Sequence, residues 1–135
     1  MQIVERETVH LLGPSLTVDL SELPVAVPAL WRRVLEGRED SATVFAELDE
    51  EPGGPAQRIT VGVLVAEPSE ETTEVPAGRW LHHEHTGAVQ DIGSTFAAMF
   101  DHAAEAGIEL TDLRLDVGYR ADGSETSHDL YLQLA

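Results

Sequence analysis

The clearest hydrophobic pattern in the chain lies between residues 88 and 106. Apolar side chains recur there at every third or fourth position, as they do on the buried face of an α-helix. Gly107 follows, and glycine commonly occupies the left-handed position just beyond a helix. We therefore predict a helix over 88–106 that ends before Gly107. Its expected buried stripe consists of Val89, Ile92, Phe96, Met99, Phe100 and Ala103.

A shorter stripe of the same kind lies in the first half of the chain. This helix is expected to begin near Ser21 and to end at Gly37. Pro24 and Pro28 fit only its first turn or the approach to it, because proline has no N–H group to donate within a helix. The stripe consists of Val27, Leu30, Trp31, Val34 and Leu35.

Alternating apolar and polar residues predict the strands. The segment 15–20 is expected to be extended or irregular, and the strands over 42–48 and 59–65 are expected to pair as a hairpin. The predicted strands cover residues 3–12, 42–48, 59–65, 79–86, 110–119 and 129–134.

Each half of the chain therefore shows the order strand, helix, strand, strand. We predict one domain over 1–135, with a first repeat over about 1–67, an acidic connector over 68–77 and a second repeat over 78–135. Two such repeats build an α+β fold: a curved antiparallel sheet with two helices on one face and a ligand cleft on the other.

Charge narrows the range of partners. The chain has 8 basic and 25 acidic residues, a formal net charge of −17, and no lysine. Nucleic acids and anionic membrane surfaces are bound through clustered basic residues, so the charge of the chain argues against both as partners. The negative electrostatic field of the protein attracts a cationic ligand or a basic patch on another protein. The alternative is that the acidic residues only keep the protein soluble.

Other compositional features point to a cytoplasmic protein. No apolar run approaches the ~20 residues of a membrane span, and the first residues lack an apolar signal core. The chain contains no cysteine, which excludes disulfides and thiolate metal sites. We expect no cofactor and a monomer or weak dimer.

Residues 75–87 resemble the signature of a known protein family. The run Val75-Pro76-Ala77-Gly78-Arg79-Trp80, followed by His85-Thr86-Gly87, resembles the signature of gyrase-inhibitor-like domains, which are also the effector-binding domains of AraC- and MerR-type regulators. The order of the later elements agrees, and Trp31 matches a common tryptophan position of that family. The resemblance implies a pseudo-twofold fold with a pocket between the repeats, where aromatic side chains and a buried carboxylate bind lipophilic, often cationic, molecules.

The chain departs from this family at one functional position. The family usually has Glu-x-Tyr in its penultimate strand, and the glutamate is its acidic pocket residue. If Tyr119 is that tyrosine, strict spacing places Val117 at the position of the glutamate. A one-residue bulge at Gly118 brings Asp116 there instead. The sequence leaves both alternatives open.

Aromatic and acidic side chains supply the other ligand candidates. Trp80 and Tyr119 can stack on a cation, although both residue types also pack in ordinary cores. An inward-facing carboxylate is expected to have a raised pKa, whereas one on an open face is simply solvated. The full set of candidate ligand-binding residues is Trp80, Tyr119, Asp116, His83, Phe45, Tyr131, Glu47 and Trp31.

Three histidines lie close together on one predicted strand. Alternation places His83 and His85 on one face and His82 with Glu84 on the other. Two imidazoles are fewer ligands than a firm metal site needs, so we expect no metal and assign His83 to the pocket lining. Its charge is then sensitive to pH.

The sequence favours a stand-alone sensor or sequestering protein for lipophilic, cationic small molecules. Two alternatives remain: an acidic interaction module that binds a basic protein such as gyrase, and a hydrolase of the same fold that uses an ionisable pair in the pocket. An enzyme is the less favoured interpretation, since no nucleophile motif is present and no catalytic residue can be named.

Overall fold

The computed structural model describes residues 1–36, 43–51 and 56–135. Within these residues none of the helices is both long enough and apolar enough to cross a membrane. The helices are α1 (Leu23–Leu35) and α2 (Ile92–Ala106), each preceded by a short 3₁₀ turn. The strands are β1 (Gln2–Arg6), β2 (Val9–Leu12), β3 (Ser15–Asp19), β4 (Val44–Glu50), β5 (Ala56–Val65), β6 (Thr72–Val75), β7 (Gly78–Thr86), β8 (Leu110–Arg120) and β9 (Ser127–Leu134).

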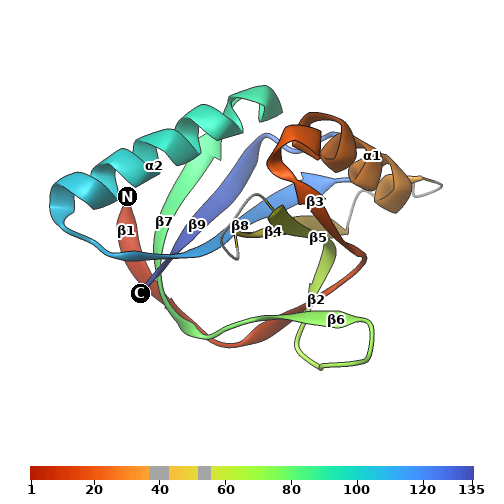
Figure 1. Ribbon diagram of the computed structural model, residues 1–135, viewed down its shortest axis with the longest axis horizontal. Coiled ribbons are helices and arrows are strands. Elements are labelled where there is room, and N and C mark those ends of the chain that lie inside the picture. The colour runs from red at the N-terminus through yellow and green to blue at the C-terminus, as the bar shows by residue number, and fades with distance from the viewer. Residues whose placement is uncertain (37–42, 52–55) are drawn as a thin grey trace.

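The predicted α+β class is confirmed. The strands form one curved antiparallel sheet in the order β1-β7-β9-β8-β4-β5-β2-β6, and β3 also pairs with β5 (Figure 1). In the first repeat β3 and β4 flank β5, and in the second β7 and β8 flank β9. The two repeats meet where β4 pairs with β8, at the centre of the sheet.

The first predicted strand, over 3–12, is wrong as a single element. It divides into β1, which pairs with β7, and β2, which pairs with β5 and β6. Thr8 lies at the break, where its hydroxyl accepts a hydrogen bond from the Ala77 N–H at 3.1 Å. The segment 15–20, expected to be extended or irregular, supplies β3, the true first strand of its repeat.

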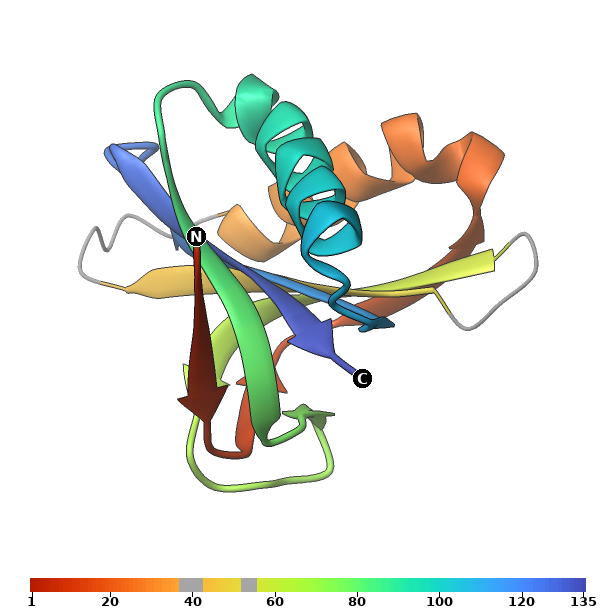
Figure 2. The same ribbon diagram turned by 90° about the vertical axis from the view of Figure 1, so that its left-hand side faces the viewer.

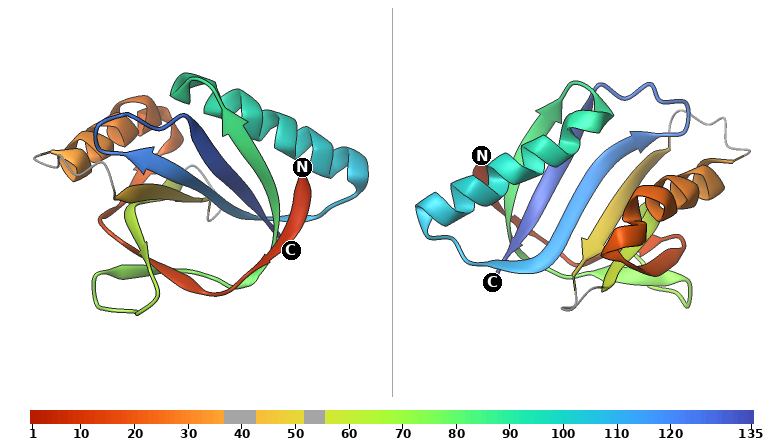
Figure 3. Two further views of the ribbon diagram at one scale, coloured as in Figure 1. Left: turned by 180° about the vertical axis from the view of Figure 1, so that it is seen from behind. Right: turned by 45° about the horizontal axis from the view of Figure 1, so that its top comes forward.

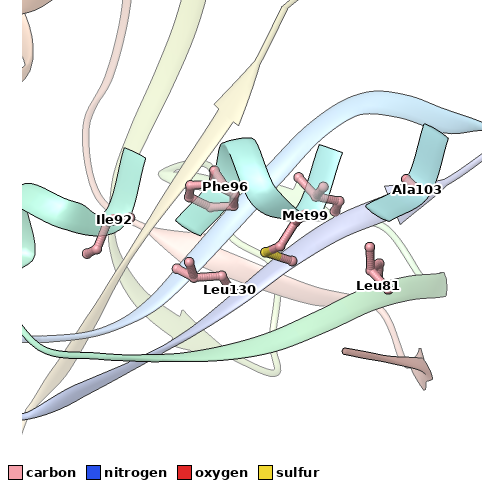
Figure 4. Close-up of a cluster of buried hydrophobic side chains, with 7 residues drawn as sticks. Leu81, Ile92, Phe96, Met99, Ala103 and Leu130 are labelled. Atoms are coloured by element: carbon pink, nitrogen blue, oxygen red, sulfur yellow. The ribbon is translucent and has the colours of Figure 1, made fainter. Parts of the chain in front are cut away.

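Helix α2 packs through one apolar face, as the hydrophobic pattern predicts. Ile92, Phe96, Met99 and Ala103 point from α2 towards Leu81 and Leu130 of the sheet (Figure 4). Gly107 follows the helix with a φ of 70°, in the left-handed conformation expected of it.

Two residues of the predicted α2 stripe are not buried. Val89 is 46% exposed and Phe100 is 40% exposed. Val89 belongs to the 3₁₀ turn that precedes the helix, and Phe100 lies beside the sheet-facing stripe rather than within it.

Helix α1 covers the other half of the same face of the sheet. Its core residue Leu30 contacts Ile59 and Val61 of β5. Pro28 lies inside this helix and not in its first turn, which corrects the sequence expectation. The helix continues through it without one backbone N–H donor, because apolar packing onto β5 outweighs that loss.

The opposite face of the sheet has a core of its own. Both helices lie on one side of the sheet, and the sheet curves away from them (Figures 1 and 2). Trp80 is fully buried on the concave side. Its buried neighbours there are Leu11, Ala46, Leu48, Val75 and Leu115.

Close backbone contact at Gly13 and Gly62 makes the curvature achievable. Strand β5 pairs with β3 through residues 56–60 and with β2 through residues 63–65. The chain crosses between these partners at Gly13, and the Val61 N–H donates to the Pro14 carbonyl at 3.1 Å. A Cβ on Gly62 would lie 1.9 Å from the Leu12 carbonyl oxygen, so no side chain fits there.

We expect Gly62→Ala to destabilise the protein by about 3 kcal/mol or more, since the clash is with backbone and not with a movable side chain. Gly93→Ala on α2 is the matched control, because a Cβ there meets no atom within 4 Å. That substitution is expected to stabilise the helix by about 0.5 to 1 kcal/mol. Chemical denaturation measures both, and a Gly62→Ala protein as stable as the wild type would contradict this account of the crossing.

Candidate ligand site

The candidate site lies on the helix side of the sheet, where β4 and β8 run between the two helices (Figure 3). Helices α1 and α2 cover the outer strands with apolar cores. The central pair instead presents ionisable side chains. We call this set the acidic cluster: Glu47, Asp49, Arg114, Asp116 and Tyr119.

A bulge at Gly118 brings Asp116 and Tyr119 to the same face. Phe45 pairs with Tyr119, but the next residue of β4, Ala46, pairs with Val117. Gly118 is therefore the extra residue, with a φ of 143° that glycine tolerates. A Cβ there would lie 2.9 Å from the Ser127 carbonyl oxygen. Of the two alternatives from the sequence, the structure places Asp116 on the same face as Tyr119, and Val117 faces away.

Trp31 joins helix α1 to the acidic cluster. Its indole N–H donates to Glu47 Oε1 at 2.6 Å, and its ring lies 4.2 Å from the Tyr119 ring, centroid to centroid. One tryptophan therefore contacts both an acidic and an aromatic candidate. It covers the carboxyl end of Glu47 from the α1 side.

His128 fixes the position of Asp116 from β9. Its Nδ1 lies 2.9 Å from Asp116 Oδ1, and both side chains are almost fully buried. The imidazole also meets the Tyr119 ring edge-on, with 4.4 Å between ring centroids. These contacts orient the carboxyl group and the phenol ring in fixed positions relative to each other.

Burial makes Glu47 and Asp49 weaker acids than carboxyl groups in water. Desolvation, with the nearby Asp49, raises the pKa of Glu47 well above its usual range, and the hydrogen bond from Trp31 only partly offsets this. Desolvation also raises the pKa of Asp49 to about 6, opposed by the Arg114 guanidinium. The two groups lie two residues apart on β4: the charge of Asp49 helps to raise the pKa of Glu47, whereas a hydrogen bond with Glu47 lowers that of Asp49.

Arg114 and Tyr119 complete the cluster. The guanidinium lies 3.4 Å from Asp49 Oδ2 and 5.7 Å from the centre of the Phe96 ring on α2. The pKa of Tyr119 is raised far above its usual range, chiefly by burial and then by the charge of Asp116, so its hydroxyl stays protonated. The cluster thus contains three carboxyl groups beside one guanidinium, between aromatic rings from both helices.

The structure divides the eight candidates from the sequence between the two faces of the sheet. Trp31, Glu47, Asp116 and Tyr119 come together in or against the acidic cluster on the helix side. The predicted cleft was on the opposite face, which the Trp80 core fills instead.

The other four candidates lie outside the acidic cluster. Trp80 is completely buried on the concave side, and Tyr131 lies beside it there under the Arg6 guanidinium. His83 lies on β7, opposite Leu130. Phe45 is buried on β4 and lines a separate groove of about 660 Å³ at the end of α1.

Sequence reasoning missed Asp49, Arg114 and His128. Asp49 and Arg114 each lie two positions from a named candidate, so strand alternation alone could have added them. His128 could not be found this way, because its contact with Asp116 depends on the β8–β9 register and on the bulge. Within the described residues no group of three or more histidines, aspartates and glutamates has metal-binding geometry.

Comparison with known proteins gives a match in structure and none in sequence. No protein-family model matches the chain, and neither does any curated protein. The structure of SAV2435 bound to tetraphenylphosphonium superposes with a TM-score of 0.73 at 8% identity, over 99% of this chain and 93% of that one.

Two more solved structures superpose on this chain over nearly its full length. A putative transcription regulation protein from Staphylococcus aureus MU50 gives a TM-score of 0.72 at 11% identity, covering 98% of this chain and 96% of the other. The C-terminal domain of EcmrR gives a TM-score of 0.64 at 10% identity, covering 99% of this chain and 96% of the other. The chain has the GyrI-like, effector-binding fold. It has this fold over its full length, as the resemblance at residues 75–87 predicted.

The acidic cluster should make the stability of the protein fall as pH rises. Asp49 has an ordinary pKa of 3.8 and about 6 in the folded protein, so between these values the folded state holds more protons than the unfolded state. The free energy of unfolding therefore decreases through this window, by about 1 to 3 kcal/mol for Asp49 alone. Glu47 acts in the same direction.

Denaturation at a series of pH values, for wild type and Glu47→Gln, tests this. The glutamine variant is expected to lose less stability on going from about pH 5 to about pH 8. Glu70→Gln, at an exposed loop position, removes the same charge from the surface and should keep the wild-type slope. If the free energy of unfolding changed with pH by the same amount in all three proteins, the raised pKa of Glu47 would be contradicted.

Proposed function

We propose that the protein binds lipophilic cations at the acidic cluster, between helices α1 and α2, and acts as a cytoplasmic sensor or sequestering module. The observation that carries the proposal is the set of three carboxyl groups, Glu47, Asp49 and Asp116, gathered under aromatic side chains in a largely water-excluded position. Such carboxyls are unfavourable in the free protein, and a cation that pairs with them relieves this.

Arg114 illustrates the chemistry the cluster offers. Its delocalised cation contacts a carboxylate, Asp49, on one side and an aromatic ring, Phe96, on the other. Both contacts favour a weakly hydrated cation over a compact, strongly hydrated one. Arg114 neutralises one carboxyl, so the cluster retains acceptor capacity for a further positive charge at Glu47 and Asp116.

A ligand that reaches Glu47 has to displace Trp31. The indole N–H of Trp31 donates a hydrogen bond to Glu47 Oε1, and its ring packs against the Tyr119 ring. Displacement exposes the faces of both rings to the ligand, which replaces the lost stacking with cation–π contact. SAV2435, whose fold this chain shares, was solved with the lipophilic cation tetraphenylphosphonium, which supports the same class of ligand here.

The other functions suggested by the sequence receive less support. The Asp116–His128 pair is the ionisable pair that a hydrolase needs, but His128 exposes 1% of its side chain. A general base must lie within hydrogen-bonding reach of the substrate, so this pair is better suited to holding Asp116 in place. The interaction with a basic protein rests on the net charge of −17 and on no particular surface.

Tetraphenylphosphonium and tetraphenylborate, which share a shape and differ in the sign of their charge, test the proposal. In a Trp80→Phe protein, where Trp31 is the remaining tryptophan, we expect the phosphonium ion to change the indole fluorescence saturably. The borate ion should give no saturable change, because the carboxyls repel it.

Two variants locate the site. Glu47→Gln should weaken phosphonium binding by about tenfold, since glutamine keeps the shape but cannot ionise to pair with the cation. Glu70→Gln should leave it unchanged. Equal binding of both ions, or equal affinity in both variants, would place any binding elsewhere and contradict the proposal.

A further inference from the structure

The apolar face of the sheet continues past the end of helix α1. Val61 of β5 is fully buried, and it packs against Leu30 of the helix. Val63 lies two positions further along the same face of β5, but it is only partly buried. Its partner on β2, Leu12, is 39% exposed. Helix α1 therefore leaves an apolar strip of the sheet uncovered.

This strip forms the floor of the groove of about 660 Å³ at the end of α1, which we call the α1-end groove. Pro14 and Val34 add apolar walls from the β2–β3 turn and from the helix. The volume lies within the range of small-molecule sites, which are mainly apolar and use a few polar groups to orient the ligand. The charged residues of its described lining are Arg33 and Glu71.

Arg33 and Glu71 bring opposite charges to the α1-end groove. Arg33 belongs to the last turn of α1, Glu71 precedes β6, and both residues are exposed, so a ligand can reach them. Neither side chain forms an ion pair or a hydrogen bond within the part of the chain that the structure describes. The two charges are therefore not paired with each other, and both are available to a ligand.

These charges limit the class of ligand. An anion would be opposed by Glu71 and by the net charge of −17, and a cation would be opposed by Arg33. A zwitterion satisfies both residues, and its net charge of zero escapes the long-range repulsion. The apolar floor requires that the two charges lie at the ends of an apolar body.

We propose that the α1-end groove binds a short aliphatic peptide with free ends. Its carboxylate pairs with Arg33, whose guanidinium can donate two parallel hydrogen bonds, and its ammonium group pairs with Glu71. Its side chains cover Leu12 and Val63 and remove their apolar surface from water. The site takes a different class of ligand from the acidic cluster and does not depend on the function proposed for that cluster.

The experiment is a titration of the ¹⁵N-labelled full chain with dileucine, followed by two-dimensional amide NMR. Three control probes each lack one feature: N-acetyl-dileucine has no ammonium group, dileucine amide has no carboxylate, and diglycine has no apolar side chain. We expect saturable shifts with dileucine that centre on residues 12–13, 33–34, 62–63 and 71. The two blocked peptides should bind about fivefold more weakly, and diglycine should cause no saturable shift. Absence of shifts at these residues, or equal affinity for all four probes, would overturn the proposal.

Neighbouring residues of the same charge supply matched variants. Arg33→Gln should weaken dileucine binding by about fivefold and leave the binding of dileucine amide unchanged, because the amide has already lost the carboxylate. Arg32→Gln removes the same charge from the same helical turn, outside this groove, and should bind dileucine as the wild type does. Equal losses in these two variants would contradict a carboxylate contact at Arg33.

The ammonium end is tested in the same way. Glu71→Gln should weaken dileucine binding by about fivefold and leave the binding of N-acetyl-dileucine unchanged. Glu70→Gln, at the exposed neighbouring position, and Glu47→Gln, in the acidic cluster, should both bind dileucine as the wild type does. A loss in either of these controls equal to that in Glu71→Gln would show that the peptide binds elsewhere.

Discussion

The rest of the structure depends on the pairing of β4 with β8, where the two repeats join. An apolar interface would be the simplest way to hold two α+β units together, and the outer strands use it beneath each helix. At the join itself Glu47 faces Asp116 across the strand pair, and Asp49 faces Arg114. Backbone hydrogen bonds hold these groups in register, so the side chains cannot move apart to relieve their repulsion.

This constraint gives the protein its proposed binding chemistry. Carboxyls held together in a poorly solvated position lose their protons less readily, which raises the pKa values of Glu47 and Asp49. The folded state therefore stores unfavourable electrostatic energy that a bound cation can release. Trp31 and Tyr119 limit access by water, and their rings suit a ligand that is itself poorly hydrated. The net charge of −17 adds a long-range attraction for any cation.

Sequence patterns predicted the fold well where a residue's environment follows from its neighbours. Helix α2, its left-handed end at Gly107 and the β4–β5 hairpin all follow from local periodicity. The break between β1 and β2 did not, because it depends on pairing with β7 and β5, which are distant in the chain. The site shows the same division. Gly118 suggested a bulge, but only the register proves that Asp116 and Tyr119 share a face, and only the β8–β9 pairing brings in His128.

Titration of the individual carboxyl groups by ¹³C NMR tests the central claim most directly. In the free protein the Glu47 and Asp49 resonances should titrate well above the ordinary range of about 4. Adding tetraphenylphosphonium should lower both pKa values, because a cation that binds the ionised form releases protons. Ordinary pKa values for both groups in the free protein, or values that stay the same when the cation is bound, would contradict an acidic cluster held ready for a positive charge.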